Sequence, residues 1–232
     1  MLADRNGEVF GRALSPLFGL CAWAVDMTAS AISPFWRESA PLILASKSAG
    51  RQKALLHSGV PFESIPADID ERAIEAQLQG FDADAIASAL ARAKALAISA
   101  EGRLVLGADQ VASCEGRIFG KPADMKEAEA LLRFLSGRRH RLHSAIALTR
   151  NGAVIFETLG VADLTMRELS DEFIAAYLTA VGENALTSAG AYQIEGMGAQ
   201  LFSKVEGDHW TIMGLPLLAL LEALRREGAL LS

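Results

Sequence analysis

The chain has 232 residues, of which 51% are hydrophobic and 22% charged, an ordinary globular composition that excludes a mainly disordered protein. Its 28 acidic and 22 basic side chains give a formal net charge of −6, which argues against binding nucleic acid by general electrostatic attraction. Only two cysteines are present, which excludes a disulfide scaffold and a cysteine-rich zinc site and predicts a reducing, cytoplasmic compartment.

Residues 1–40 differ in character from the rest of the chain. An apolar stretch at 13–25 precedes small residues that imitate a signal-peptide cleavage site, but the segment before it has no net positive charge. The stretch is also shorter than the roughly 20 residues of a membrane-spanning helix, and no later segment is long and apolar enough. We expect residues 1–40 to be a non-catalytic extension, with Met27 as a candidate later start, and residues 41–232 to form the functional unit. Secretion is the less favoured alternative.

Strands alternate with helices in the first half of the predicted unit. Residues 42–45 and 104–108 are short apolar runs typical of buried strands, and 62–65 is a third such segment. Helical periodicity covers 51–57 and, most clearly, 84–101, where apolar residues form a stripe along one face. This alternation predicts an α/β fold.

Hairpins dominate the second half. Asn151-Gly152 is a strong turn signal between predicted strands, and Glu115-Gly116 marks another hairpin. Further helices are expected where a capping residue or a proline precedes an amphipathic segment, at 124–135, 170–181 and 215–226. We therefore expect a mixed rather than a purely parallel sheet, with two lobes and a cleft between them.

A serine-rich turn between the first strand and the first helix is a candidate phosphate site. Its free backbone N–H groups, the hydroxyls of Ser46 and Ser48 and the positive end of the helix dipole all favour an anion. The alternative is that Ser48 only caps the helix and that Arg51 is a solvated surface residue. The glycine and lysine spacing of a P-loop is absent.

Two carboxylates and two lysines are candidates for a charged site. Asp109 follows a predicted buried strand, at the end where open α/β sheets bind ligands, and Glu71 lies beside Asp70 after another strand. Carboxylate oxygens without histidine or cysteine at metal spacing suit Mg²⁺ or Mn²⁺ rather than zinc. The alternative is that Asp70 and Glu71 cap the following helix and that Lys94 and Lys121 are solvated.

The four histidines form no catalytic pattern that the sequence reveals. His140 and His143 lie three residues apart in a predicted strand, a spacing that points them to opposite faces. Neither His57 nor His209 has an obvious partner. We therefore predict no Ser–His–Asp arrangement.

Short motifs occur in a specific order along the chain. In that order they span Leu42–Arg51, Ile69–Glu71, Leu90–Ala95, Gly107–Val111, Gly120–Pro122, Leu135–Arg138, Ala191–Gly196, Glu206–Asp208 and Met213–Leu217. Together they cover about Pro41 to Gly228, and this ordered set resembles the Maf family.

The resemblance implies a nucleoside triphosphate pyrophosphatase of the housecleaning type, which acts on modified or non-canonical nucleotides. Such an enzyme hydrolyses the α–β phosphoanhydride to a nucleoside monophosphate and pyrophosphate, and requires a divalent metal cation, Mg²⁺ or Mn²⁺. The implied fold is a Maf/ITPase-like α/β structure with an elongated mixed β-sheet flanked by helices and two lobes around a substrate cleft. The implied assembly is a homodimer. A nucleotide-sensing regulator of septum formation is an alternative function.

The resemblance also assigns residues by matching position. Those that would hold phosphate are Ser46, Ser48 and Arg51. Those that would bind metal or activate water are Glu71 and Asp109, with Asp109 as the catalytic base. Those that would complete the charged catalytic site are Lys94 and Lys121.

Three positions linked to base selection in the family differ from its dTTP/UTP-specific branch. Gly50 stands where the family commonly has arginine and its 7-methyl-GTP branch has an aromatic residue that could stack on the base. Gln110 stands where the dTTP/UTP branch has threonine, and Glu195 where that branch has glutamine. Glutamine and glutamate at the last two positions resemble the 7-methyl-GTP branch. A carboxylate can accept hydrogen bonds from a guanine edge or favour a cationic methylated base, so we expect such nucleotides to be preferred. The alternative is a dTTP/UTP pyrophosphatase.

Overall fold

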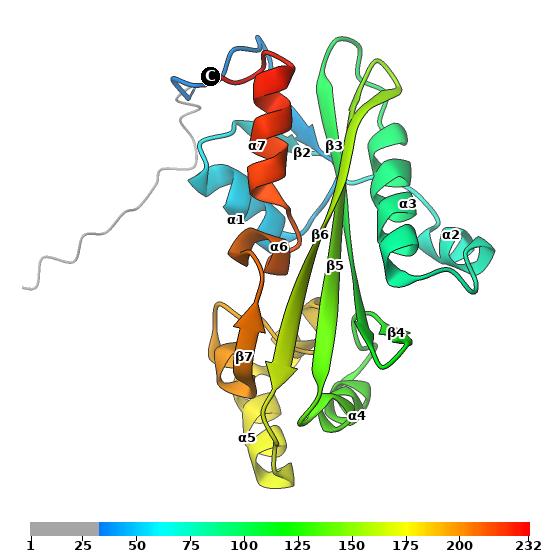
Figure 1. The fold of residues 1–232 in the computed structure, drawn as a ribbon, viewed down its shortest axis with the longest axis vertical. Helices are drawn as coiled ribbons and strands as arrows, with labels where there is room; N and C mark the ends of the chain where they lie inside the picture. Colours follow the sequence, from blue (N-terminus) through cyan, green and yellow to red (C-terminus); the bar gives the residue numbers. More distant parts are fainter. Residues whose placement is uncertain (1–32) are drawn as a thin grey trace, which may run out of the picture. The chain divides into compact units, whose positions relative to one another are not determined.

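The computed structural model describes residues 33–232, which are built around a mixed sheet (Figure 1). Its seven strands are β1 (Leu42–Leu44), β2 (Phe62–Ser64), β3 (Leu104–Cys114), β4 (Arg117–Phe119), β5 (Arg139–Arg150), β6 (Ala153–Met166) and β7 (Phe202–Glu206). The order is β2-β1-β3-β5-β6-β7, and β4 pairs with β3. The short strand β1 runs parallel to β2 and β3, whereas all other pairs are antiparallel. The predicted mixed sheet is confirmed.

Helices flank this sheet. They are α1 (Ala49–His57), α2 (Glu71–Gln77), α3 (Ala83–Leu96), α4 (Met125–Leu135), α5 (Asp171–Val181), α6 (His209–Ile212) and α7 (Leu217–Arg226), with 3₁₀ segments η1 (Gly182–Thr187) and η2 (Met197–Leu201). Asp124 and Ser170 cap α4 and α5 by accepting backbone N–H groups, as their positions predict. Helix α3 ends earlier than its periodicity predicts, because Ile98 and Ala100 leave it to pack against a buried cluster around Val105.

The expectation that a strand ends before Asp109 is wrong. Strand β3 continues to Cys114, so Asp109 lies inside it. The polar pair Asp109 and Gln110 interrupts the apolar pattern of the sequence, but the antiparallel ladder with β5 runs without a break from Leu104 to Ser113. Long-range pairing therefore extends a strand that local pattern alone divides.

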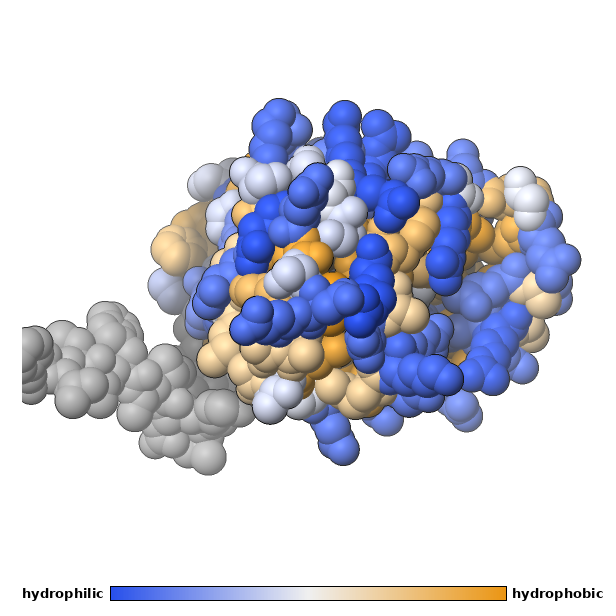
Figure 2. Space-filling model, turned by 90° about the horizontal axis from the view of Figure 1, so that it is seen from below, coloured by the Kyte–Doolittle hydropathy of each residue, from blue (hydrophilic) through white to orange (hydrophobic). Residues whose placement is uncertain are grey.

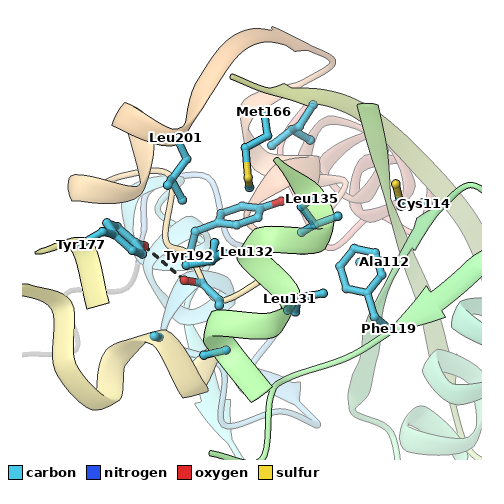
Figure 3. Close-up of a cluster of buried hydrophobic side chains, with 14 of the residues drawn as sticks. Ala112, Cys114, Phe119, Leu131, Leu132, Leu135, Met166, Tyr177, Tyr192 and Leu201 are labelled. Atoms are coloured by element: carbon cyan, nitrogen blue, oxygen red, sulfur yellow. Dashed lines mark hydrogen bonds between the residues drawn. The ribbon is translucent and has the colours of Figure 1, made fainter. Parts of the chain in front are cut away.

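Two large hydrophobic clusters share the long central strands. One cluster contains β1, α1, α7 and the first half of β3. The other surrounds α4 and α5, where Leu132 and Leu135 point toward Tyr192 and Met166 (Figure 3). These clusters form two lobes, and the substrate cleft between them stays a prediction. Seen from the end at which α4 and α5 lie, the surface is mostly hydrophilic with smaller hydrophobic areas (Figure 2).

Residues 33–40 pack against the rest of the described chain. Trp36 is buried, forms a β-bridge with Leu230 and donates a hydrogen bond from its indole to the carbonyl of Ala40. The packed unit therefore begins before Pro41, although a non-catalytic role for residues 1–40 stays a prediction. The apolar stretch at 13–25, Cys21 and Met27 lie outside the described residues. Within the described part, no helix has the length and apolarity needed to cross a membrane.

Candidate active site

The candidate residues gather beside a stretch of β3 that has a strand neighbour on one side only. On the side of β1, pairing with β3 reaches Leu106, and pairing with β4 begins at Ala112. Within residues 33–232, no strand covers the edge between these two points. Since N–H and C=O groups alternate in direction along a strand, this stretch presents backbone groups toward the gap. Asp109 thus lies just beyond the parallel part of the sheet, although β3 itself continues.

A close approach between α3 and β3 places Lys94 over Asp109. A Cβ atom on Gly107 would lie 2.1 Å from the carbonyl oxygen of Ala91, so the two backbones can meet only because this residue is glycine. Asp109 follows two residues along the same face of the strand. The Lys94 ammonium lies 2.6 Å from Asp109 Oδ1, and both residues are less than 10% exposed. The interpretation of Lys94 as a solvated helix charge is therefore wrong.

Glu71 completes this group of charges from the first turn of α2. Its Oε1 atom lies 3.0 Å from the ammonium of Lys94. The neighbouring residue, Asp70, caps α2 by accepting the N–H of Ala73 at 3.0 Å. The capping alternative thus holds for Asp70, whereas Glu71 faces Lys94. We call Arg51, Glu71, Lys94 and Asp109 the charged cluster.

Arg51 is buried rather than solvated. Its Nη1 atom donates to Ser46 Oγ at 2.9 Å, and its Nε atom donates to the carbonyl of Gly214 at 2.9 Å. Burial lowers the pKa of Arg51, and the nearby carboxylates of Asp109 and Glu71 oppose this effect. The two hydrogen bonds fix the guanidinium in place, and the carboxylates of Asp109 and Glu71 favour its charged form.

The turn before α1 keeps groups available for an anion. Ser46 Oγ accepts the backbone N–H of Ser48 at 3.2 Å, which orders the turn. Ser48 occupies the N-cap position of α1, but its side chain makes no capping hydrogen bond. The alternative that Ser48 only caps the helix is therefore wrong, and its hydroxyl is free to contact a ligand at the positive end of α1.

The segment from Thr211 to Gly214, to which the sequence analysis assigned no role in the site, contacts both Gln110 and Arg51. The Gln110 Nε2 atom donates to Ser144 Oγ at 2.8 Å and to the carbonyl of Ile212 at 3.0 Å. Ser144 Oγ donates in turn to the carbonyl of Thr211 at 2.7 Å. These contacts anchor α6 just before Gly214, whose positive φ of 90° turns the chain where its carbonyl meets Arg51. The motif beginning at Met213 was the available sequence signal.

The other two base-selection positions both involve α1, because Gly50 lies in its first turn and Glu195 contacts it from outside. A Cβ atom on Gly50 would lie 3.1 Å from the carbonyl of Met213, so a bulky side chain would require the neighbouring segment to move. Glu195 Oε1 lies 2.8 Å from Lys53 Nζ on the same helix, and both side chains are partly exposed. Gly50 and Gln110 thus contact the same segment, and Glu195 reaches α1 from the other lobe.

Lys121 stands apart from the charged cluster. It is exposed in the loop between β4 and α4, and no ion pair of the described residues includes it. The structure therefore brings together Ser46, Arg51, Glu71, Lys94 and Asp109 but does not connect Lys121 to them. The catalytic role of Lys121 stays a prediction.

Comparison with known proteins identifies the family. The sequence profile of the Maf-like protein family matches residues 41–227. The chain belongs to the Maf family. A nucleoside triphosphate pyrophosphatase from Nitrobacter winogradskyi is 52% identical over 84% of this chain and 98% of the relative. One of the same name from Rhodopseudomonas palustris is 53% identical over the same shares. A 7-methyl-GTP pyrophosphatase from Rhizobium etli is 52% identical over 82% of this chain and 97% of the relative.

The carboxylate oxygens in the charged cluster of this Maf-family chain suit Mg²⁺ better than zinc. Glu71 and Asp109 supply carboxylate oxygens close to each other, since both contact the ammonium of Lys94. Among residues 33–232, no three histidine, cysteine or acidic side chains gather as a complete protein-only site. Mg²⁺ is often held by one or two carboxylates with water and substrate phosphate as the other ligands, whereas zinc requires more protein ligands. The residues fit a hard divalent cation completed by the substrate.

Proposed function

We propose that this Maf-family chain is a nucleoside triphosphate pyrophosphatase that hydrolyses the bond between the α- and β-phosphates. The observation that carries this proposal is the charged cluster, in which two carboxylates, a lysine and an arginine converge beside the free edge of β3. Support comes from the Nitrobacter and Rhodopseudomonas relatives, which bear this name and match over 98% of their own length.

Different residues of the chain bind the phosphates, accept the proton of the attacking water and neutralise the leaving group. Arg51, the Ser48 hydroxyl and the N–H groups at the start of α1 bind the phosphate oxygens. Asp109, oriented by its 2.6 Å contact with Lys94, accepts a proton from the water that attacks the α-phosphorus. The new bond forms between the water oxygen and phosphorus, and the bond to the bridging oxygen breaks, so that pyrophosphate leaves. Lys121, on its exposed loop, neutralises charge on the leaving group.

Glu71 and Asp109 are the residues that we propose to hold Mg²⁺ or Mn²⁺. When bound, such a cation would neutralise phosphate charge and lower the pKa of a bound water. The support is the chemistry of the two carboxylates and their shared contact with Lys94.

We further propose that guanine-type or 7-methylated nucleotides are preferred over dTTP and UTP. The Glu195 carboxylate can accept two hydrogen bonds from the guanine edge or attract a cationic methylated base, whereas uracil offers a single N–H donor. The Lys53 contact at 2.8 Å holds this carboxylate next to α1. The Rhizobium etli relative, named a 7-methyl-GTP pyrophosphatase, supports this preference.

A screen of natural and modified nucleoside triphosphates with the purified full-length protein tests both proposals. Product analysis in the presence of Mg²⁺ or Mn²⁺ should show pyrophosphate and the matching monophosphate, with 7-methyl-GTP or GTP turned over faster than dTTP and UTP. A best rate with dTTP or UTP would overturn the base preference alone. Absence of pyrophosphate release with every nucleotide would overturn the proposed activity.

We also propose a cytoplasmic homodimer that does not bind nucleic acid. The acidic composition and the two cysteines support the compartment and the lack of nucleic-acid affinity, and the resemblance to the family supports the dimer. Light scattering of the purified protein should give twice the chain mass. Titration with labelled single-stranded DNA should give no binding at any salt concentration.

A further inference from the structure

A second polar group lies on the same face of the sheet as Asp109, at the opposite end of α3 from Lys94. Ser113 Oγ lies 2.8 Å from His143 Nε2, and His143 Nδ1 lies 2.5 Å from Asp84 Oδ1. The three residues come from β3, β5 and the first turn of α3. The expectation that the chain contains no Ser–His–Asp arrangement is therefore wrong. Packing of α3 across β3 and β5 assembles it from segments that lie far apart in the sequence.

The contact with Asp84 determines which nitrogen of a neutral His143 ring carries the proton. An ionised carboxylate can only accept, so the contact with Asp84 requires His143 to carry its proton on Nδ1. When the ring is neutral, Nε2 carries the lone pair and can accept the hydroxyl proton of Ser113, 2.8 Å away. A hydroxyl that donates to an imidazole oriented by a carboxylate is the arrangement that activates a serine nucleophile.

Ser113 lies between one apolar and one basic side chain, both partly exposed, which favour a ligand with an apolar and an anionic group. Its backbone is opposite Ile118 on β4 and Arg141 on β5, so these side chains extend from the same face. Ile118 is 40% exposed, and the Arg141 side chain is 56% exposed. Arg139 and Arg141 both pair with Asp163, and Glu206 also acts on Arg139, whereas Arg141 contacts Asp163 through Nε and can donate from its terminal nitrogens to an anion. An apolar group and an anionic group could therefore lie on either side of the hydroxyl.

This group is separate from the charged cluster. Ser113 and Asp109 are four residues apart on β3, a distance of about 13 Å along an extended strand. Val111 lies between them on the same face and is buried against α3. Neither Ser113 nor His143 has a hydrogen bond or ion pair with a residue of the charged cluster.

We propose that Ser113, His143 and Asp84 form a second reactive site that takes an activated acyl compound with an anionic leaving group, such as an acyl phosphate. Ser113 Oγ attacks the carbonyl carbon and its proton passes to His143 Nε2; the bond from carbon to the phosphate oxygen then breaks, and His143 gives that proton to the leaving phosphate. Water then attacks the acyl-serine, His143 takes a proton from it, and the returning proton restores the Ser113 hydroxyl. The products are a carboxylic acid and inorganic phosphate. Asp84 is a positioning residue that orients the imidazole.

Labelling of the full-length protein with a fluorophosphonate probe, followed by peptide mass spectrometry, tests the nucleophile. We expect the adduct on Ser113, no adduct in Ser113→Ala, and labelling at least about 100-fold slower in His143→Gln. The matched control is Ser203→Ala, because Ser203 Oγ donates only to the carbonyl of Thr165 and should not react. Asp84→Asn should slow labelling and change its dependence on pH, which a purely structural residue would not do.

Acetyl phosphate and p-nitrophenyl acetate test turnover. We expect release of phosphate or nitrophenol that is lost in Ser113→Ala and retained in Asp109→Asn, whereas pyrophosphate release should show the reverse pattern. Circular dichroism establishes that each variant is folded, and Ser113→Cys supplies a second nucleophile that should still be labelled by an acyl probe. Equal labelling of Ser203 and Ser113, or undiminished reactivity in Ser113→Ala, would overturn the proposal without affecting the pyrophosphatase activity.

Discussion

Two sets of buried titratable side chains lie on opposite faces of the sheet and have opposite electrostatic surroundings. Asp109 and Lys94 lie between β3 and α3, where each has a partner of opposite charge at 2.6 Å. His140 lies on the other face of β5, where it is 1% exposed among the rings of Phe119, Tyr192 and Phe202. The first set is buried as charges, whereas the second is buried as a neutral group.

The difference between these two regions follows from their partners. His140 Nε2 lies 2.7 Å from the Tyr192 hydroxyl, while its Nδ1 atom has no hydrogen-bond partner within the described residues. Burial without a countercharge lowers the pKa of His140 from 6.5 to about 4. Burial with a countercharge instead fixes ionised groups in defined positions, as a site that binds a polyanion requires. Burial alone therefore does not distinguish a functional group from one that serves packing.

The largest effect is expected from removing the cation of the charged cluster. Lys94→Met would leave the carboxylates of Asp109 and Glu71 without their shared partner, and should lower the free energy of unfolding by about 3 kcal/mol. Arg92→Met is the matched control on the same helix, because Arg92 pairs with Glu157 at an exposed site and should cost less than about 1 kcal/mol. Urea unfolding measures both. An equal decrease in the free energy of unfolding in both variants would contradict the idea that the buried ion pair contributes more than the exposed one.

Activity should depend on Asp109 in the charged cluster and on Lys121, which lies outside that cluster. Asp109→Asn keeps the size of the side chain and removes the proton acceptor, so kcat for pyrophosphate release should fall at least about 100-fold.

Lys121→Ala should lower kcat by a similar factor, because the charge on the leaving pyrophosphate would no longer be neutralised, although Lys121 makes no ion pair in the described residues. Thermal unfolding should show both variants folded. Unchanged turnover in either purified variant would contradict the role proposed for that residue.

The neutral histidine should make stability depend on pH. Between pH 7 and pH 5 the unfolded chain takes up a proton at His140 and the folded chain does not, so acid lowers the free energy of unfolding. From a folded pKa of about 4, this loss should reach about 2 kcal/mol. Chemical unfolding at several pH values should show that the free energy of unfolding changes less with pH in His140→Phe than in the unchanged protein. Tyr192→Phe retains the buried ring of His140 and should keep the slope, so an equal flattening in both variants would contradict this assignment.

The smallest effect is expected at the exposed pair that joins α1 to the other lobe. Lys53→Met should lower the free energy of unfolding by less than about 1 kcal/mol, because both side chains are partly solvated. The same change should alter the ratio of kcat/KM between 7-methyl-GTP and UTP, since Lys53 positions the Glu195 carboxylate. Steady-state kinetics with both nucleotides measures this ratio. An unchanged ratio of kcat/KM would contradict a role of Lys53 in base selection.

Local features of the fold are largely readable from the sequence. Asp124 and Ser170 mark helix starts because their side chains accept backbone N–H groups close by, and Asn151 adopts the positive φ that the hairpin requires. The continuity of β3 through Asp109 was not readable in this way. It depends on pairing with β5, a strand some thirty residues further along the chain.

The sequence by itself determined the order of the motifs, the family and the residue types that the site contains. Only the tertiary structure decided which of these residues are buried and which meet. The contact between Lys94 and Asp109 depends on a close approach of α3 that Gly107 permits, and the contacts of Ser113 with His143 and of His143 with Asp84 depend on the same helix crossing two strands. Partner distance and burial set the charge state of a side chain, and both arise from long-range packing that local pattern does not contain.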